Sequence, residues 1–278
     1  MARFSPARRW ALGAALLCVL PFSHAADDKK LVITGSSTVA PLVLEIAKRF
    51  EQKNPGVRVD VQTGGSSRGV NDARSGVADI GMVSRALKPD EQDLKASAIA
   101  LDGVAVILHK INPVKALSAD QIRAIYTGKV LNWKEVGGKD QRITVVNKAE
   151  GRSTLELFLA YFQLKNSEIK ALVVIGDNQQ GVKTVAGNPG AIGYVSIGTG
   201  EFEVEQGTPL QLLPLDGIAP TSDAVRSGKF PLSRPLNLVT KGEPTGRAKQ
   251  FIEFAKSAQV NDLVKEQYFV PFAVTGAR

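Results

Sequence analysis

From residue 31 onward, the chain alternates short β-rich runs with stretches of helical periodicity. The clearest example is a strand predicted at residues 31–34, followed by a helix at residues 41–52 that carries Leu42, Ile46 and Phe50 on one face. The alternation continues with strands predicted at residues 57–61, 78–83 and 143–147 and a helix at residues 154–162. It predicts an α/β fold in which helices cover both faces of the sheets.

The chain has 278 residues, of which 44% are hydrophobic and 22% are charged. These proportions are typical of a globular protein and exclude a coiled coil or a largely disordered chain. The length allows one large domain or two lobes. The continuous apolar run at residues 104–108 suits a strand buried on both faces, or a crossing of the chain between two lobes.

Residues 1–25 have the pattern of a signal peptide. Arg3, Arg8 and Arg9 precede an apolar run at residues 10–22, which is too short to span a bilayer. We therefore expect cleavage after the alanine at position 25 and secretion of the remaining chain.

Cysteine and histidine are too few for several kinds of site. Removal of residues 1–25 takes away Cys18 and His24 and leaves His109 as the one histidine of the mature chain. Disulfide frameworks, cysteine nucleophiles and zinc sites are thereby excluded, and no metal or other cofactor is expected. Cys18 would be the acylated residue of a lipoprotein, but the bulky Leu17 before it disfavours that signal.

The mature chain is moderately basic. Loss of three arginines with the signal peptide leaves 32 basic and 27 acidic side chains, a net charge of +5. This charge serves general solubility or attracts an anionic ligand. No run of five or more Lys or Arg occurs and aromatic residues make up only 6%, so a nucleic-acid partner is not expected.

Three predicted strand-to-helix turns share one chemistry. They are Gly-Ser-Ser-Thr at residues 35–38, Gly-Ser-Ser-Arg-Gly at residues 65–69 and Gly-Arg-Ser-Thr at residues 151–154. The first turn of a helix has free N–H groups at the positive end of the helix dipole, and nearby hydroxyls add further donors. Each turn alone is an ordinary helix cap, but turns at the carboxyl ends of strands converge in α/β folds. Together they predict a single anion site.

Four cationic side chains lie in or beside these turns and are candidates for the countercharge: Arg68, Arg85, Lys148 and Arg152. For any one of them, a position on a solvated rim is the ordinary alternative.

Two enzymatic interpretations are weighed against this site. No G-x-x-x-x-G-K-[ST] motif is present, which excludes a P-loop. Residues 65–69 do match the G-x-S-x-G pattern of serine hydrolases, with Ser67 as the nucleophile. That mechanism needs a general base, and His109, at the end of an apolar run, is the one histidine available.

With these turns located, the chain resembles the periplasmic phosphate-binding proteins of bacterial high-affinity phosphate ABC transporters. The similarity covers almost all of the mature chain, and its most distinctive stretch runs from Ile125 to Gly138. It is carried by Gly-Ser-Ser-Thr-Val-Ala-Pro at 35–41, Gly-Ser-Ser at 65–67, Leu-Asp-Gly-Val-Ala-Val at 101–106, Ile-Tyr-Thr-Gly-Lys at 125–129, Asn-Trp-Lys-Glu-Val-Gly-Gly at 132–138, Gly-Ala-Ile-Gly-Tyr-Val at 190–195 and Pro-Leu-Ser-Arg-Pro-Leu at 231–236.

The resemblance implies a two-lobed type II periplasmic binding protein fold, in which each lobe is a mixed sheet flanked by helices. We expect residues 31–105 and 234–278 to form one lobe and residues 106–233 to form the other. Such lobes close on their ligand by a hinge motion. The implied function is capture of phosphate in the periplasm and its delivery to ABC transporter permease subunits, by a monomer that is not an enzyme.

Carried over by position, the resemblance assigns ligand contacts from both lobes. Ser37 offers its hydroxyl, Thr38 its backbone N–H, and Ser66 both groups, with Ser67 as a helper. The other lobe contributes the donors of Gly151, Arg152, Ser153 and Thr154.

The chain departs from the family pattern at two charged positions. Lys148 stands where the family usually has an arginine, and Arg85 stands where better-studied members have an aspartate that accepts the proton of phosphate. A pocket that has only hydrogen-bond donors cannot accept that proton, so its preference for phosphate over a fully ionised anion such as sulfate is weaker. The alternatives are therefore a sulfate-like oxyanion or a phosphorylated small molecule as ligand, an adhesion or signalling role, or a serine hydrolase that uses Ser67.

Overall fold

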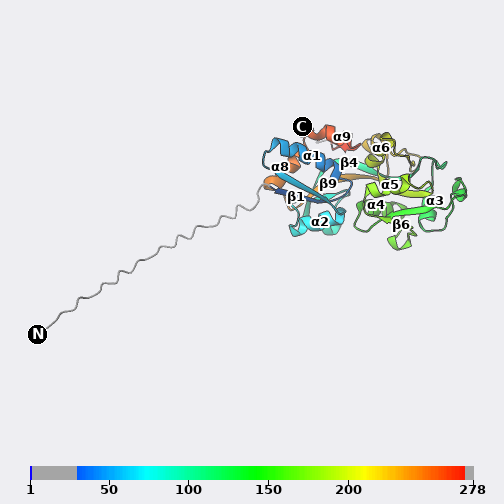
Figure 1. Cartoon of the computed structure of the whole chain (residues 1–278), viewed down its shortest axis with the longest axis horizontal. Helices are drawn as coiled ribbons and strands as arrows, with labels where there is room; N and C mark the ends of the chain where they lie inside the picture. Colours follow the sequence, from blue (N-terminus) through cyan, green and yellow to red (C-terminus); the bar gives the residue numbers. More distant parts are fainter. Residues whose placement is uncertain (2–29, 273–278) are drawn as a thin grey trace.

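The computed structural model describes Met1 and residues 30–272, and the predicted signal peptide otherwise falls outside the described residues. Within them, ten strands form one continuous sheet (Figure 1). The strands are β1 (Lys30–Gly35), β2 (Arg58–Thr63), β3 (Ile80–Val83), β4 (Leu94–His109), β5 (Thr144–Lys148), β6 (Val173–Ile175), β7 (Ala191–Ser196), β8 (Leu210–Leu212), β9 (Ser233–Lys241) and β10 (Val270–Pro271).

Helices connect most of the strands, as the alternation in the sequence predicts. They are α1 (Ala40–Lys53), α2 (Ser66–Ser75), α3 (Ala119–Tyr126), α4 (Ser153–Phe162), α5 (Asn178–Ala186), α6 (Ile197–Glu205), α7 (Ser222–Arg226), α8 (Gly246–Ala255) and α9 (Asn261–Glu266). Short 3₁₀ helices lie at Pro89–Glu91, Trp133–Val136, Asn166–Glu168 and Ala258–Val260.

The strand order is β2-β1-β3-β9-β4-β7-β5-β6, with β8 and β10 paired to β4. Strands β1, β2 and β3 run parallel, as do β7, β5 and β6, whereas β9 and β4 are antiparallel to their neighbours. The long strand β4 therefore takes part in both halves of the sheet. Its first part pairs with β9 and its last part with β7, so the apolar run at residues 104–108 is both a buried strand and a crossing.

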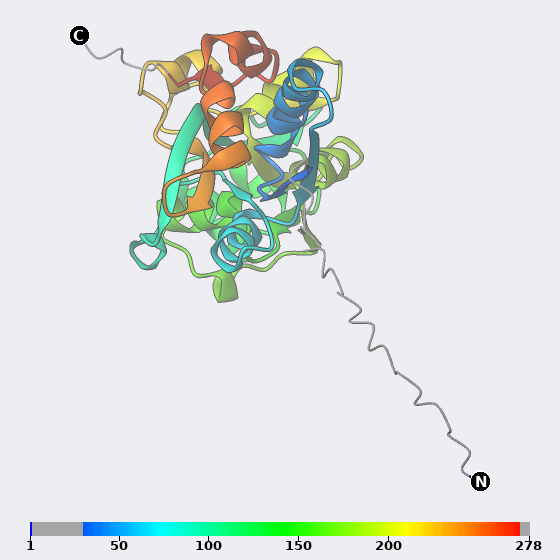
Figure 2. The same ribbon diagram turned by 90° about the vertical axis from the view of Figure 1, so that its left-hand side faces the viewer.

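One half of the sheet is covered on both faces by helices from the two ends of the described chain. Helices α1, α8 and α9 pack on one face through Leu42, Ile46 and Phe251, against Ile33 and Leu238 of the sheet. Helix α2 packs on the opposite face. Figure 2 shows α8 and α1 beside each other on this half, away from α2.

The other half is covered in the same way by the middle of the chain. Helices α3 and α4 pack on one face, where Phe158 stacks on Tyr194 with ring centroids 4.1 Å apart. Helix α5 packs on the other face through Val182 and Val185. In Figure 1 these helices lie on one side of β4 and β9, while β1, α1, α2 and α8 lie on the other.

Apart from the strand expected at residues 104–108, which is the last part of the much longer β4, the predicted elements agree with the structure to within two or three residues. The helix expected at residues 41–52 is α1, and the helix expected at residues 154–162 is α4. The strand expected at residues 78–83 is shorter and begins at Ile80. Among the described helices, none is both long enough and apolar enough to cross a bilayer.

Candidate functional site

A small polar cavity lies where the two halves of the sheet meet. The centre of a water-sized sphere can move over a volume of only about 10 Å³ inside it. The cavity therefore suits a small ion and not an extended molecule. Its walls come from the carboxyl ends of β1, β2, β3, β5 and β6, the edge at which α/β sheets bind ligands. The lining residues are Ser36, Ser37, Thr38, Gly65, Ser66, Ser84, Lys148, Arg152, Ser153, Thr154 and Gly176.

Two of the helices that begin at this cavity have no side-chain cap. The caps of α2 and α4 are Gly65 and Arg152, and neither side chain accepts a bond from the first turn. Helix α5, which begins just after Gly176 of the lining, is capped by the Asp177 side chain, and α3 and α7, which begin elsewhere, are capped by Ser118 and Thr221. The starts of α2 and α4 therefore keep backbone donors for a ligand.

The floor of the cavity contains a buried ion pair between the two strands that join the halves. Asp102 of β4 and Arg234 of β9 are register partners, and Arg234 Nη2 lies 2.8 Å from Asp102 Oδ2. Asp102 Oδ1 also accepts from the N–H of Gly198 at 3.2 Å. The Arg234 side chain is fully buried, and Asp102 supplies the opposite charge that compensates it.

Arg234 reaches hydroxyls on both sides of the cavity. Its Nη1 donates to Thr154 Oγ1 at 3.1 Å and its Nη2 donates to Thr38 Oγ1 at 3.3 Å. The backbone N–H of Ser84 donates to Ser66 Oγ at 3.2 Å. A hydroxyl that accepts from such a donor keeps its own hydrogen to donate. The Thr38, Thr154 and Ser66 hydroxyls are thus directed to act as donors toward a ligand.

Two cations lie in the wall of the cavity, and its lining contains no carboxylate. Lys148, at the end of β5, is 3% exposed and its Nζ donates to the carbonyl of Asp177 at 3.2 Å. Burial, together with the nearby charge of Arg234, lowers the pKa of Lys148 to about 7. Burial also lowers the pKa of Arg152, against the opposing charge of Asp177. Both cations lack a carboxylate partner here and favour an anion.

Two buried donors of the lining have no hydrogen-bond partner among the described residues. They are Nε of Arg152 and Oγ of Ser153, at the start of α4. Because an unsatisfied buried polar group is costly, each indicates a missing acceptor. The arrangement can therefore bind a small anion by hydrogen bonds from hydroxyls, backbone amides and two cations.

Arg85 does not join this cavity, contrary to the expectation from its position after β3. Its guanidinium forms a bidentate pair with Glu91, at 2.6 and 2.8 Å, and its Nε lies 2.7 Å from Glu156 Oε2 on α4. Burial opposes the charge on Glu91, but the bond from Arg85 holds the pKa of that carboxyl below its ordinary value. Arg68 is likewise paired, with Asp72 at 3.0 Å.

Two of the predicted backbone donors, the N–H groups of Ser67 and Thr38, have other partners. The N–H of Ser67 donates to the carbonyl of Gly151 at 3.2 Å, so these two residues contact each other and do not line the cavity. The N–H of Thr38 donates to Ser36 Oγ at 3.2 Å, which leaves the hydroxyl as the group of Thr38 that faces the site. Ser37, Ser66, Lys148, Arg152, Ser153 and Thr154 do line it.

The hydrolase interpretation finds no support in the geometry. A triad needs a histidine beside Ser67, but His109 lies at the far end of β4, in register with Leu210 of β8. Its Nδ1 accepts from the N–H of Ile111 at 3.2 Å. Ser67 and His109 therefore have separate partners.

Sequence reasoning missed the residues that organise the cavity, above all Asp102 and Arg234. A signal for them was present, because each charge interrupts or borders an apolar strand, where an unpaired charge is rare. Their pairing, however, joins positions 132 residues apart. Ser36, Ser84, Gly65 and Gly176 were also not singled out.

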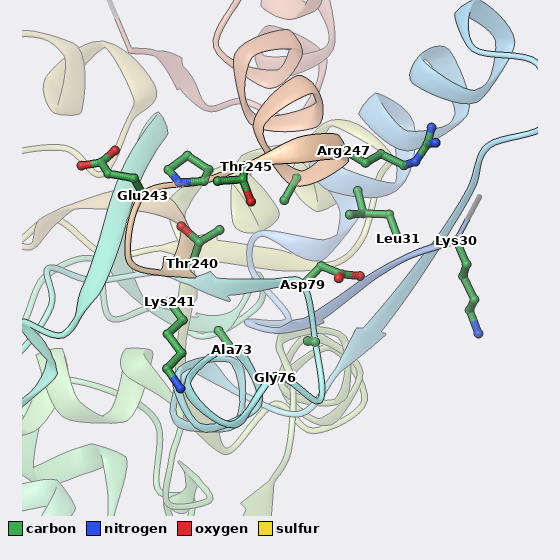
Figure 3. A pocket seen from close by; sticks show the side chains of 13 residues that line it. Lys30, Leu31, Ala73, Gly76, Asp79, Thr240, Lys241, Glu243, Thr245 and Arg247 are labelled. Carbon is green, nitrogen blue, oxygen red and sulfur yellow. The ribbon is translucent and has the colours of Figure 1, made fainter. Parts of the chain in front are cut away.

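A larger cavity, of about 400 Å³, lies elsewhere, between the beginning of β1 and α8 (Figure 3). Figure 3 shows Asp79, Thr240, Lys241, Glu243 and Arg247 around it. None of the residues of the small cavity lines it, and it carries two carboxylates. Its mixed charge does not match the donor-only chemistry predicted from the turns.

Two α/β halves joined by β4 and β9, with a polar cavity between them, define the class of the periplasmic binding proteins. The family model for the PBP superfamily domain matches residues 21–259. The phosphate-binding protein PstS of Bacillus subtilis (strain 168) is 35% identical over 247 residues, which cover 87% of this chain and 80% of the relative.

Two solved structures show the same similarity. A putative phosphate ABC transporter substrate-binding protein with bound phosphate, from Clostridium perfringens, has a TM-score of 0.81 and 35% identity, over 88% of this chain and all of the other. An ABC-type phosphate transport receptor from Vibrio cholerae has a TM-score of 0.70 and 31% identity, over 86% and 99% of the two chains. The present chain belongs to the family of these PstS proteins. The family and the fold class inferred from the sequence are thereby confirmed.

Proposed function

We propose that this protein captures inorganic phosphate in the cavity between its two halves and delivers it to an ABC transporter. The observation that carries the proposal is the donor-only lining, in which Arg152 Nε and Ser153 Oγ are buried without a partner. An anion supplies the acceptors that these groups lack. The names of the Bacillus relative and the bound phosphate of the Clostridium structure support phosphate as that anion.

The ligand contacts follow from the lining. The hydroxyls of Ser37, Thr38 and Ser66 donate from one side, and Ser153 and Thr154 donate from the start of α4. Lys148 and Arg152 supply the positive charge. We assign Arg85, Ser67 and Gly151 no direct contact, because none of them lines the cavity and Arg85 is paired with Glu91.

The two halves act as lobes, formed by residues 31–105 with 234–278 and by residues 106–233. The crossings of β4 and β9 near positions 105 and 233 are the hinge. Direct bonds join the lobes in this structure, for example Asn178 Nδ2 to Thr38 Oγ1 at 3.1 Å and Ser67 N–H to the carbonyl of Gly151. It therefore corresponds to the closed state, and opening breaks these bonds to admit the ligand.

The setting follows from the family and from the N-terminus. A cleaved signal peptide at residues 1–25 directs the chain to the periplasm, where a monomer presents its closed form to permease subunits. Binding takes place without turnover, since relatives such as the Clostridium protein are described as substrate-binding proteins.

Titration calorimetry of the purified protein with phosphate and with sulfate tests the proposal. We expect one phosphate per chain, and weaker binding in Ser153→Ala and Thr154→Val, each by about tenfold for one lost hydrogen bond to a charged ligand. Ser167→Ala is the matched control, because Ser167 is exposed and lies outside the cavity.

Failure of the wild-type protein to bind phosphate would overturn the proposal. Sulfate is the second candidate, because the lining offers no carboxylate to accept the proton of a protonated phosphate. Tighter binding of sulfate than of phosphate would establish that alternative.

A further inference from the structure

The lining of the cavity has an inner wall and a solvent side. Most of its side chains, from Ser36 to Thr154, are at most 4% exposed. The lining residues that are partly exposed are Ser37, Arg152 and Gly176. Of these three, only Arg152 has a long, charged side chain.

Glycines on both lobes make room for the Arg152 side chain. A Cβ atom at Gly65, at the start of α2, would lie only 2.9 Å from Arg152 Cδ and 3.2 Å from its Nε. A Cβ atom at Gly176, after β6, would lie 3.4 Å from Arg152 Nη2. Arg152 is thus held between a turn of one lobe and a turn of the other, on the partly exposed side of the cavity.

We infer that Arg152 determines the class of ligand: it closes the solvent side of the cavity and restricts binding to a free inorganic oxyanion, excluding phosphate monoesters. This inference rests on the proposed function. A monoester carries one carbon substituent that must leave the cavity. The centre of a water-sized sphere can move over only about 10 Å³ in the cavity, and Lys148, the other long side chain of the lining, is buried. We therefore expect the substituent to displace the Arg152 guanidinium.

The exclusion has a steric and an electrostatic part. Moving the guanidinium aside removes the acceptor that the anion provides for Nε, which is already buried without a protein partner. It also replaces a cation beside the ligand by a neutral carbon group. Both effects act against the ester and neither acts against the inorganic anion.

Titration calorimetry with phosphate, methyl phosphate and glycerol 3-phosphate tests the role of Arg152. The wild-type protein is expected to bind methyl phosphate about 100-fold more weakly than phosphate, which is the scale of discrimination by a closed pocket. Arg152→Ala should bind phosphate more weakly. It should also reduce the ratio of phosphate affinity to methyl phosphate affinity by about tenfold or more. Arg152→Gln keeps a cover without the charge, so it should bind phosphate weakly and still reject the esters.

Arg68→Ala is the matched control, because Arg68 lies in the first turn of α2 but is paired with Asp72 outside the cavity. It should leave the ratio unchanged. Melting temperatures establish that each variant is folded.

The outcomes separate this inference from the proposed function. A wild-type protein that binds no phosphate contradicts both. Binding of phosphate with an unchanged ester ratio in a folded Arg152→Ala contradicts only the role of Arg152. Tight binding of glycerol 3-phosphate by the wild type also contradicts that role, and would place the ester in the neighbouring groove of about 220 Å³ beside Ser37.

Discussion

Asp102 and Arg234 face each other across β4 and β9, and 2.8 Å separates their charged groups at the point where the two halves of the protein meet. The pair is buried beneath the cavity, and Arg234 extends from it to hydroxyls on both lobes, Thr38 and Thr154. One ion pair thus fixes the crossing strands and orients donors on both sides of the ligand.

Removal of one partner should leave the other as an uncompensated buried charge. We predict that Asp102→Asn lowers the free energy of unfolding by about 3–5 kcal/mol, measured by urea denaturation. Asp60→Asn is the control, because its ion pair with Lys30 spans 3.6 Å at the surface. That variant should lose less than about 1 kcal/mol. Equal losses in the two variants would show that the buried pair has no special weight.

A different set of ion pairs, centred on Glu156 of α4, joins the two lobes. Glu156 Oε2 lies 2.7 Å from Arg85 Nε, and Glu156 Oε1 accepts from Lys88 Nζ at 3.1 Å. Both cations belong to the opposite lobe. Glu156→Gln should weaken the closed state and raise the rate of phosphate dissociation by about five- to tenfold. Arg85 keeps Glu91 as a partner, so the fold should persist.

Rapid dilution into a phosphate trap measures that rate. Asp93→Asn is the control, since the Arg74–Asp93 pair has the same 2.7 Å separation but lies within one lobe. If both variants release phosphate at the wild-type rate, the ion pairs of Glu156 do not stabilise the closed state. Because Lys88 is partly exposed, the effect of Glu156→Gln should shrink at high salt.

The sequence allowed the elements with a local pattern to be predicted. Helix α1 shows its apolar face at a spacing of four residues, and the three glycine–hydroxyl turns announce helix starts. Strand β9 had no such signal, because Pro235, Asn237 and Thr240 interrupt its apolar residues. It is buried because it pairs with β3 and β4, which is a property of the assembled sheet.

The sequence allowed the donor chemistry of the site to be predicted, but not which side chains pair with each other. Turns at the ends of parallel strands converge by topology, so Ser66, Ser153 and Thr154 could be grouped in advance. The fate of Arg85 depended on which carboxylates the fold brings beside it, and one of these, Glu156, lies on the other lobe. A charge and its buried partner cannot be matched from one sequence when they are far apart along the chain.

Phosphate binding should depend on the protonation of Lys148, whose pKa is about 7 because of burial and the charge of Arg234. A bound anion stabilises the ammonium form and raises this pKa, so binding takes up a proton. Well below the pKa the lysine is already charged. Above it, binding must also supply the proton, and affinity therefore falls as the pH rises.

Calorimetry at about pH 8 in two buffers of different protonation enthalpy measures the proton uptake. Lys148→Arg is the matched variant, because arginine stays charged throughout this range. The proton of phosphate contributes equally to both proteins, so the difference between them isolates Lys148. Equal proton uptake by the wild-type and variant proteins would show that Lys148 is not protonated on phosphate binding.

Gly65 should be required for closure of the lobes and not merely for the turn. Its φ is +98°, and a Cβ atom there would lie 2.6 Å from the carbonyl oxygen of Gly151 and 2.9 Å from Arg152 Cδ, both on the other lobe. These clashes exist only when the lobes are closed. We expect small-angle scattering to show that the wild-type protein becomes more compact on phosphate binding. Gly65→Ala should abolish this compaction and weaken affinity by at least about tenfold.

Positive φ alone strains an alanine by about 1–3 kcal/mol, and this effect must be separated from the clash. Gly76, at the other end of α2, has a φ of +77° and no atom within 4 Å of the position of a Cβ. Gly76→Ala should lower the melting temperature but retain compaction and phosphate affinity. If Gly65→Ala also retains compaction and phosphate affinity, the lobes close with more space between Gly65 and Gly151 than this structure allows. Gly65 is then not required for closure.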